Sequence, residues 1–192
     1  MTIYVDAPAI QYFVPSSTLE EASKYFKAAV AGSFKEAEER TLRLQSCDKN
    51  TLESFLYWLH RDHLPDKADD VSFETYEATL IRLWAFADHH LLPRLQNEVM
   101  NQIFEIMSGS IMQEETARVV FEATAAGSLL RQLVVREVMR DHYGEPSRMD
   151  VFAVIPGFMS AVIEELIEAK GDRAQIREMS AASLREYTVS EV

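Results

Sequence analysis

The sequence predicts an α+β fold in which a small β-sheet is covered by helices and is followed by a purely helical region. Two observations predict the sheet. β-Branched and aromatic residues cluster at 3–5 and 10–14, and residues 40–44 alternate polar and apolar side chains. A third observation predicts the helices, because from Ser72 onward apolar residues recur at helical spacing along nearly all of the chain. Three short strands cannot bury both faces of a sheet by themselves, so we expect helices to close it.

The first elements are separated by recognisable turn and cap residues. Residues 6–8 (DAP) predict a turn between the first two strands, and Pro15 ends the second strand. Ser17 and Glu20 have the spacing of a capping box, so a helix is predicted to begin there and to continue to Gly32.

The next helix is predicted to be capped by Asp48 or Asn50 and to end before Pro65. Its inward face has i, i+3, i+4, i+7 spacing and consists of Leu52, Phe55, Leu56 and Leu59. Residues 66–70 (DKADD) are expected to form a solvated loop.

The second half is predicted to contain helices only. The helix after Ser72 has a stripe made of Tyr76, Leu80, Leu83, Trp84 and Ala87. Pro93 lies in the first turn of the following helix, whose inward residues are Leu95, Val99, Ile103 and Ile106. Further helices are predicted at 114–126, at 129–142 and around residues 158–167. Beyond Gly171 the pattern weakens to a marginal helix or a tail.

Composition and charge narrow the function. The chain carries 19 basic and 31 acidic residues, a formal net charge of −12, and its Lys and Arg residues are dispersed among acids. We therefore expect neither nucleic acid nor a membrane as partner. No apolar run is long enough to span a bilayer, and the N-terminus lacks the features of a secretion signal, so an intracellular protein, cytoplasmic or nuclear, is expected. The single cysteine, Cys47, is expected to be an unreactive structural or surface residue.

Two histidine pairs are candidates for metal binding or catalysis, whereas the carboxylate clusters such as Glu164-Glu165 are expected to be solvated faces. His60 and His63 have i, i+3 spacing, which suits zinc on a helix, but no third ligand lies nearby in the sequence. His89 and His90 follow Asp88, yet adjacent helical residues diverge by about 100°, so both cannot serve one site. Motifs for a nucleophile, a phosphate or a dinucleotide are missing. We predict no catalytic, metal or cofactor-binding residue, and hence not an enzyme.

Three blocks of sequence, taken in order, carry a resemblance to a known family. Residues 11–44 contain Tyr12, Leu19, Ser23, Tyr25-Phe26 and Phe34-Lys35-Glu36. Residues 51–65 read TLESFLYWLHRDHLP, and residues 80–104 read LIRLWAFADHHLLPRLQNEVMNQIF. Together they resemble the BTB/POZ domain, and the phrasing is closest to fungal members of that family. The resemblance covers residues 3 to about 107. It implies a BTB/POZ domain at 1–109, a helical extension at 110–170 and a tail or marginal helix at 171–192.

The resemblance implies a protein–protein interaction module. By family analogy, the partner-binding face comprises Leu59, His60, Asp62, His63, Leu92 and Leu95. Homodimerisation is expected through Ile3, Val5, Leu19 and Tyr25. The core is expected to comprise Leu42, Leu44, Phe26, Phe55, Leu56, Trp84 and Leu95, with Asp88 bonding backbone or capping a helix.

Two kinds of protein partner follow from the resemblance: a second copy of the chain and a cullin scaffold, for which the module would act as a ubiquitin-ligase substrate adaptor. The chain departs from cullin-binding members at His60, where they usually carry an aromatic residue, and it begins at the first strand, without the arm that swaps between subunits. Two other classes stay open. One is an enzyme or small-ligand protein with its site in the helical half, and the other is a structural oligomerisation unit.

Overall fold

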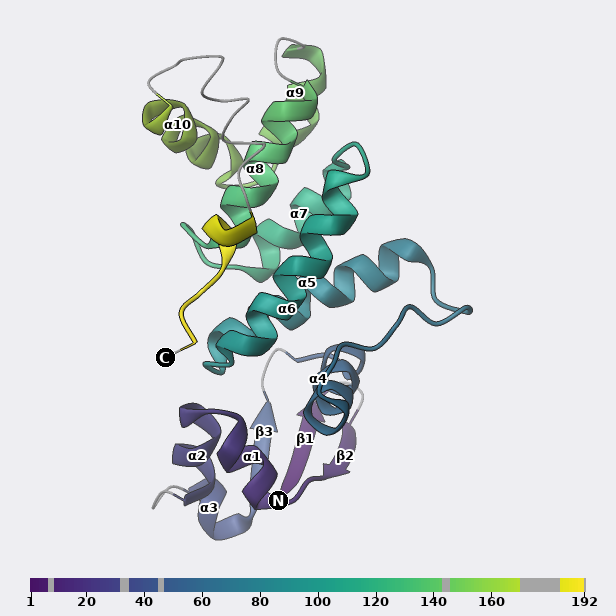
Figure 1. The fold of residues 1–192 in the computed structure, drawn as a ribbon, viewed down its shortest axis with the longest axis vertical. Helices are drawn as coiled ribbons and strands as arrows, with labels where there is room; N and C mark the ends of the chain where they lie inside the picture. The colour runs from purple at the N-terminus through teal and green to yellow at the C-terminus, as the bar shows by residue number, and fades with distance from the viewer. Residues whose placement is uncertain (7–8, 32–34, 45–46, 143–145, 170–183, 192) are drawn as a thin grey trace.

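The computed structural model describes residues 1–6, 9–31, 35–44, 47–142, 146–169 and 184–191. Within these residues the protein is α+β and mostly helical, which confirms the predicted class. Figure 1 shows the sheet and the first four helices at one end of the molecule, helices α5 and α6 across the middle, and helices α7–α10 at the other end. None of the described helices combines the length and the apolar character needed to cross a bilayer.

The sheet contains β1 (Thr2–Asp6), β2 (Ala9–Phe13) and β3 (Thr41–Leu44) in the order β2-β1-β3. Strand β1 is antiparallel to β2 and parallel to β3, so that Ile3 lies opposite both Tyr12 and Leu42. Leu42 and Leu44 point into the core while Arg43 between them is exposed, as the alternating pattern predicts. The predicted turn at residues 6–8 lies partly outside the described residues.

The connection between the parallel strands β1 and β3 includes α1 (Ser16–Ala22), α2 (Lys24–Ala31) and α3 (Lys35–Glu39). The prediction of one long helix capped by Ser17 was wrong. Helix α1 is preceded by Pro15 without a side-chain cap, and Ser23 adopts extended backbone angles that divide the helix in two. The Ser23 hydroxyl then accepts a hydrogen bond from the backbone N–H of Phe26 at 3.2 Å, so a short polar side chain stabilises the new helix start.

Helix α4 (Lys49–Arg61) follows the sequence pattern closely. Asp48 is its N-cap and accepts a hydrogen bond from the backbone N–H of Thr51 at 2.9 Å. Leu52 and Phe55 are fully buried, and Asp62 ends the helix in the left-handed conformation with φ 63°.

Helices α5 (Phe73–His89) and α6 (Pro93–Ser108) form the central pair. The N-caps are Ser72 and Leu92, and Pro93 occupies the first turn of α6 as predicted. Among the described residues, the Asp88 carboxylate has no hydrogen bond to a backbone N–H, so the predicted backbone or capping bond is not found there. Instead the carboxylate accepts a hydrogen bond from Gln96 Nε2 at 3.0 Å, which ties the end of α5 to the start of α6.

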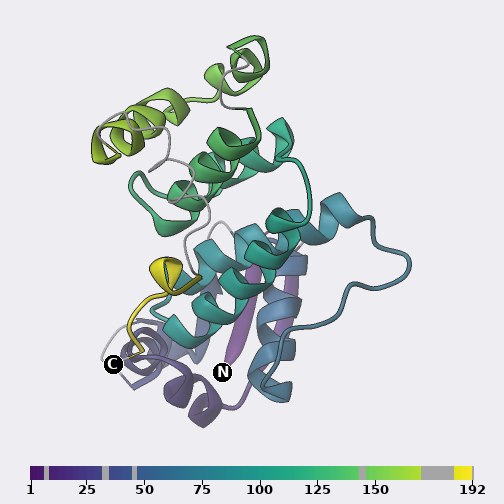
Figure 2. The same ribbon diagram turned by 45° about the horizontal axis from the view of Figure 1, so that its top comes forward.

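The extension consists of α7 (Glu114–Ala123), α8 (Leu129–His142), α9 (Pro146–Ala153), α10 (Phe158–Glu168) and the short 3-10 helix η1 (Leu184–Tyr187). Helices α7–α10 lie together at the end of the molecule away from the sheet in Figure 2, whereas η1 lies beside α6. The bounds of α8 match the prediction, but α7 ends three residues early. Arg131 from α8 donates to the carbonyl oxygens of Phe121 and Thr124 at that end, which completes the last turn.

The buried apolar residues form one cluster that runs from the sheet into the extension. Helix α5 joins the two ends because it packs against α4, α6 and α7. Trp84 and Leu83 are buried on the same helix as Ile81, and Ala117 and Val120 of α7 are buried as well. The predicted boundary at residue 109 is therefore not a gap in the core.

Arg136 links the parts of the extension. It is buried on α8, and its Nε donates to Glu165 Oε2 on α10 at 2.6 Å. Its Nη1 donates to Glu186 Oε2 at 3.2 Å and to the Tyr187 hydroxyl at 3.3 Å. Burial lowers the pKa of the guanidinium, but the hydrogen bonds and charges of these partners outweigh it and raise the pKa.

Candidate functional site

The residues predicted as a partner-binding face divide into two groups. His60, Asp62 and His63 are exposed at the end of α4, and Leu59 beside them is partly buried. Leu92 and Leu95 are fully buried, so their assignment to a docking surface was wrong. The reason is that α6 begins at Pro93 and turns these two leucines toward α5 and the core.

The residues predicted for homodimerisation are also mostly internal. Ile3 and Leu19 are fully buried in the core, which corrects their assignment to an interface. Tyr25 is partly exposed, but its ring packs edge-on against His90 with centroids 4.7 Å apart. The side chain of Val5 lies outside the described residues.

An exposed aromatic groove lies between the end of β2 and the outer face of α4. Phe13 is 80% exposed and Tyr57 is 39% exposed, although both are large apolar rings. The groove has a volume of about 480 Å³ and is lined by Tyr12, Phe13, Val14, Glu53, Leu56, Tyr57, His60 and Arg61. We call this set the β2–α4 groove. Exposed apolar side chains gathered at one place on a surface are typical of interaction sites.

The sequence contained a signal for this groove. Tyr12 and Val14 alternate with Phe13 along the strand, so one of the two sets has to point away from the core. Tyr57 lies outside the helical stripe of Leu52, Phe55, Leu56 and Leu59, and hence on the solvent side of α4. Their proximity could not be predicted, because it depends on how α4 packs beside the hairpin.

The acidic and basic side chains of the β2–α4 groove differ in their contacts, because Glu53 is engaged by neighbours and Arg61, among the described residues, is not. Glu53 Oε1 accepts a hydrogen bond from the Tyr12 hydroxyl at 2.7 Å and lies 3.8 Å from Lys49 Nζ. Burial, with this hydrogen bond and the charge of Glu53, raises the pKa of Tyr12 to about 12, so the phenol stays protonated as a donor. Within the described part of the chain, neither His60 nor Arg61 forms an ion pair.

Beside the groove, the end of α4 is fixed to α6 by a charged cluster. Arg94 bonds Asp62 at 2.6 Å and Glu98 at 3.1 Å, and Trp58 Nε1 donates to Glu98 at 2.9 Å. The hydrogen bond from Arg94 holds the pKa of Asp62 below its usual value. Asp62 is therefore occupied within the chain, whereas Arg61 is exposed and lines the groove together with His60.

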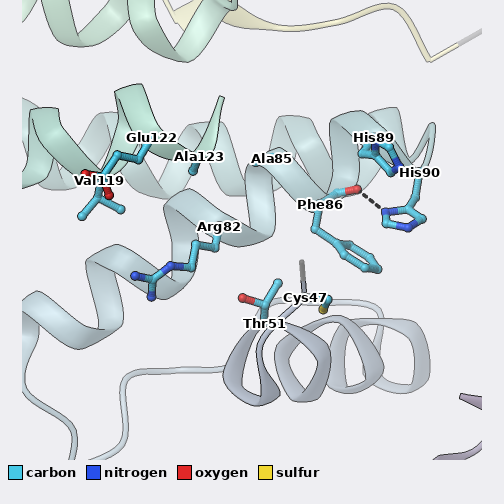
Figure 3. A pocket seen from close by; sticks show the side chains of 10 residues that line it. All are labelled: Cys47, Thr51, Arg82, Ala85, Phe86, His89, His90, Val119, Glu122 and Ala123. Carbon is cyan, nitrogen blue, oxygen red and sulfur yellow. Dashed lines mark hydrogen bonds between the residues drawn. The ribbon is translucent and has the colours of Figure 1, made fainter. Parts of the chain in front are cut away.

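A separate pocket lies between the start of α4, the outer part of α5 and helix α7 (Figure 3). Its volume is about 510 Å³, and its lining residues are Cys47, Thr51, Arg82, Ala85, Phe86, His89, His90, Val119, Glu122 and Ala123. A second cavity of about 550 Å³ lies between α5, the end of α6 and the start of α7. Both are at the junction between the sheet-containing end and the extension.

Two titratable groups of the Figure 3 pocket are neutral at pH 7. Burial, with the charge of Asp48, raises the pKa of Cys47 to about 12, so its thiol is not ionised at neutral pH. Burial lowers the pKa of His90 to about 4, and its Nδ1 lies 2.7 Å from the Phe86 carbonyl oxygen. Arg82 lies 3.7 Å from Asp48. These contacts are those of packing and helix capping.

The remaining histidines have local contacts. His63 Nδ1 lies 2.9 Å from the carbonyl oxygen of Leu64, and its ring meets Tyr57 edge-on at 5.3 Å. Among the described residues there is no group of three or more His, Cys, Asp or Glu side chains that could hold a metal ion.

A comparison with models of known protein families and with curated proteins finds no match to this chain.

Proposed function

We propose that the chain is a protein–protein interaction module with a BTB/POZ-like fold, and that the β2–α4 groove is its docking surface. The observation that carries the proposal is the juxtaposition, in one groove, of exposed Phe13 and Tyr57 with His60 and Arg61, which form no ion pair with another described residue. Rings at the centre and charges at the margin are the usual composition of a protein interface.

The groove favours one kind of partner segment. It is lined by the rings of Phe13 and Tyr57, and Arg61 gives it an exposed positive charge in a chain with a net charge of −12. A helix or strand that presents an apolar residue next to an acidic one satisfies both features. The module works inside the cell, in the cytoplasm or the nucleus, where a single free cysteine is the common pattern.

The test compares the proteins captured by three forms of the chain. Phe13→Asp combined with His60→Asp places two negative charges in the groove without touching the core. Val154→Asp is the matched control, because Val154 is a 68% exposed apolar residue on the extension. Partners bound by the wild type and by the control, but lost from the groove variant, are the expected result. Equal capture by all three forms would contradict the proposal.

A cullin scaffold and a second copy are the two partners that the resemblance to BTB/POZ domains implies. Purified cullin scaffold mixed with the wild type and with the groove variant tests the adaptor role, for which the variant is expected to bind at least tenfold more weakly. Light scattering over a range of protein concentrations tests homodimerisation. A mass that rises with concentration in the wild type, but not in the groove variant, would assign self-association to the same surface.

A further inference from the structure

The last described residues of the chain lie along helix α6. Figures 1 and 2 both show η1 and the residues after it, drawn in yellow, beside α6. Residues 188–191 continue from η1 without helical or strand assignment. We call residues 184–191 the C-terminal segment. Its contacts with α6 and α8 span 50 to 94 positions in sequence, so they are tertiary contacts that hold the segment in place.

Asn97 of α6 forms hydrogen bonds with the backbone of this segment. The Val189 N–H donates to Asn97 Oδ1 at 2.7 Å, and Asn97 Nδ2 donates to the Val189 carbonyl oxygen at 3.0 Å. One side-chain amide thus satisfies both polar groups of one backbone residue, as a neighbouring strand would do. Because both bonds go to the backbone, they fix the register of an extended peptide whatever side chain stands at that position.

Side chains on both sides of that pair add selectivity. Tyr187 is 2% exposed, and its hydroxyl accepts a hydrogen bond from Arg136 Nη1 at 3.3 Å. Glu186 bonds the same guanidinium at 3.2 Å. On the other side, Glu191 Oε1 accepts from Asn97 Nδ2 at 2.9 Å. The bound pattern therefore has an acidic residue at 186, an aromatic residue at 187, a backbone that pairs with Asn97 at 189 and an acidic residue at 191.

The segment is short, and most of its described side chains are exposed or only partly buried. One aromatic ring is buried, one amide pairs with the backbone, and Glu186, Thr188 and Glu191 are exposed. Segments with so little buried surface open locally at a lower free energy than the whole fold. When the segment leaves, Asn97 loses its pairing with Val189 and Arg136 loses Glu186 and Tyr187, while Arg136 keeps Glu165.

We propose that the surface of α6 and α8 around Asn97 and Arg136 is a binding site for an extended, acidic, tyrosine-containing peptide of a partner protein. The chain's own C-terminal segment occupies the site in cis and competes with that partner. Attachment to the same chain gives the segment a high effective concentration, so a second copy of the same segment is a weak competitor. A partner peptide has to match the site better.

The experiment uses the labelled peptide LREYTVSEV, which is residues 184–192, and measures its fluorescence anisotropy with the whole chain. Val189→Pro in the protein removes the backbone N–H that donates a hydrogen bond to Asn97 Oδ1, and it leaves α6 and α8 intact. Ser190→Pro is the matched control. We expect Val189→Pro to bind the peptide about tenfold more tightly than the wild type, because its own segment competes less well, and Ser190→Pro to resemble the wild type.

Two further variants identify the site. Asn97→Ala added to Val189→Pro is expected to weaken peptide binding at least tenfold, whereas Asn101→Ala, an exposed asparagine one turn later on α6, leaves it unchanged. A peptide with alanine in place of Tyr187 is expected to bind at least tenfold more weakly. The proposal is overturned if Val189→Pro binds no peptide, or if Asn97→Ala and Asn101→Ala have equal effects.

Hydrogen exchange on the wild type covers the case in which a variant does not fold. The amide of Val189 is expected to exchange at least tenfold faster than the amides of Val99 and Met100 in the buried part of α6. Equal protection at all three amides means that the C-terminal segment opens only when the whole protein unfolds. That result would exclude a displaceable segment and with it the competition in cis.

Discussion

The imidazole ring of His90 stacks on the phenyl ring of Phe26, with centroids 5.4 Å apart and planes 6° from parallel. Phe86 and Tyr25 enclose the other sides at 4.0 and 4.7 Å. Burial removes the water that would solvate a charged imidazole, and this desolvation lowers the pKa of His90 to about 4. His90 joins α2 to the end of α5 as a neutral core residue.

The stability of the fold is therefore expected to depend on the protonation of His90. Between pH 6.5 and pH 4 the unfolded chain binds this proton and the folded chain does not, so acidification lowers the free energy of unfolding. From pH 7 to pH 5 the loss is about 2 kcal/mol. Burial raises the pKa of Glu137 to about 7, so protonation of Glu137 increases the free energy of unfolding over part of this pH range.

The measurement is consequently a difference between proteins. Urea unfolding at pH 7 and pH 5 is compared for the wild type and His90→Phe, and the part due to His90 is expected to vanish in the variant. His89→Gln changes the exposed neighbour and is expected to keep the wild-type dependence. An identical pH dependence in the wild type and His90→Phe would show that His90 is not the group responsible.

The buried pair Arg136–Glu165 is expected to follow the rule for ion pairs inside proteins. Arg136→Met leaves the Glu165 carboxylate buried without its partner, at a cost of about 3–5 kcal/mol in the free energy of unfolding. Adding Glu165→Leu removes that charge and is expected to recover most of the loss. Arg118→Met, in the more exposed pair with Glu114, is expected to cost less than about 1 kcal/mol. Denaturant unfolding of the four proteins provides the comparison.

Leu91 is expected to be a strained position that glycine relieves. It lies between α5 and α6 with φ 54°, in the left-handed region, and is 57% exposed. A left-handed conformation costs a residue with a Cβ about 1–2 kcal/mol, of which the greater freedom of unfolded glycine cancels part. Leu91→Gly is thus expected to raise the free energy of unfolding by about 0.5–1 kcal/mol.

Ile111 provides the matched comparison for Leu91. It is also 57% exposed but does not have a positive φ. Ile111→Gly has no strain to relieve and is expected to lower stability by about 0.5–1 kcal/mol. Thermal melts of both variants separate backbone strain from the loss of an exposed apolar side chain, and effects of the same sign would argue against strain.

Cys47 is expected to react slowly while the protein is folded. Its side chain is buried and its pKa is raised to about 12, so little thiolate is present or accessible. Modification by a disulfide reagent at pH 8 is expected to be at least 100-fold slower than in urea. Rapid modification under native conditions would mean that the pocket in Figure 3 exposes a reactive thiol.

Much of the fold could be predicted because local signals and burial agree. Asp48, Ser72 and Pro93 mark the starts of α4, α5 and α6, and the alternation around Arg43 marks β3. The break at Ser23 was missed because the apolar spacing of Leu19 and Phe26 continues across it. A side chain that caps a helix and one that merely lies within it look alike in a sequence.

The candidate site was predicted only in part. His60 and Asp62 were placed at the right end of α4, since a helix end next to a charged loop is normally exposed. Leu92 and Leu95 were misplaced, because the direction of a leucine near a helix start depends on how that helix crosses its neighbour. The pairing of Asn97 with Val189 joins residues 92 positions apart, and neither has a local pattern that indicates the other.

Helix α5 belongs to two neighbourhoods at once, since it packs against α4 toward the sheet and against α7 in the extension. A fragment cut at residue 109 would leave the α7-facing side of α5, including Ile81, in contact with water. The sheet-containing end and the extension are thus not structurally independent units. In evolution, a change that reshapes the sheet-containing end has to be tolerated by a helix that the extension also uses.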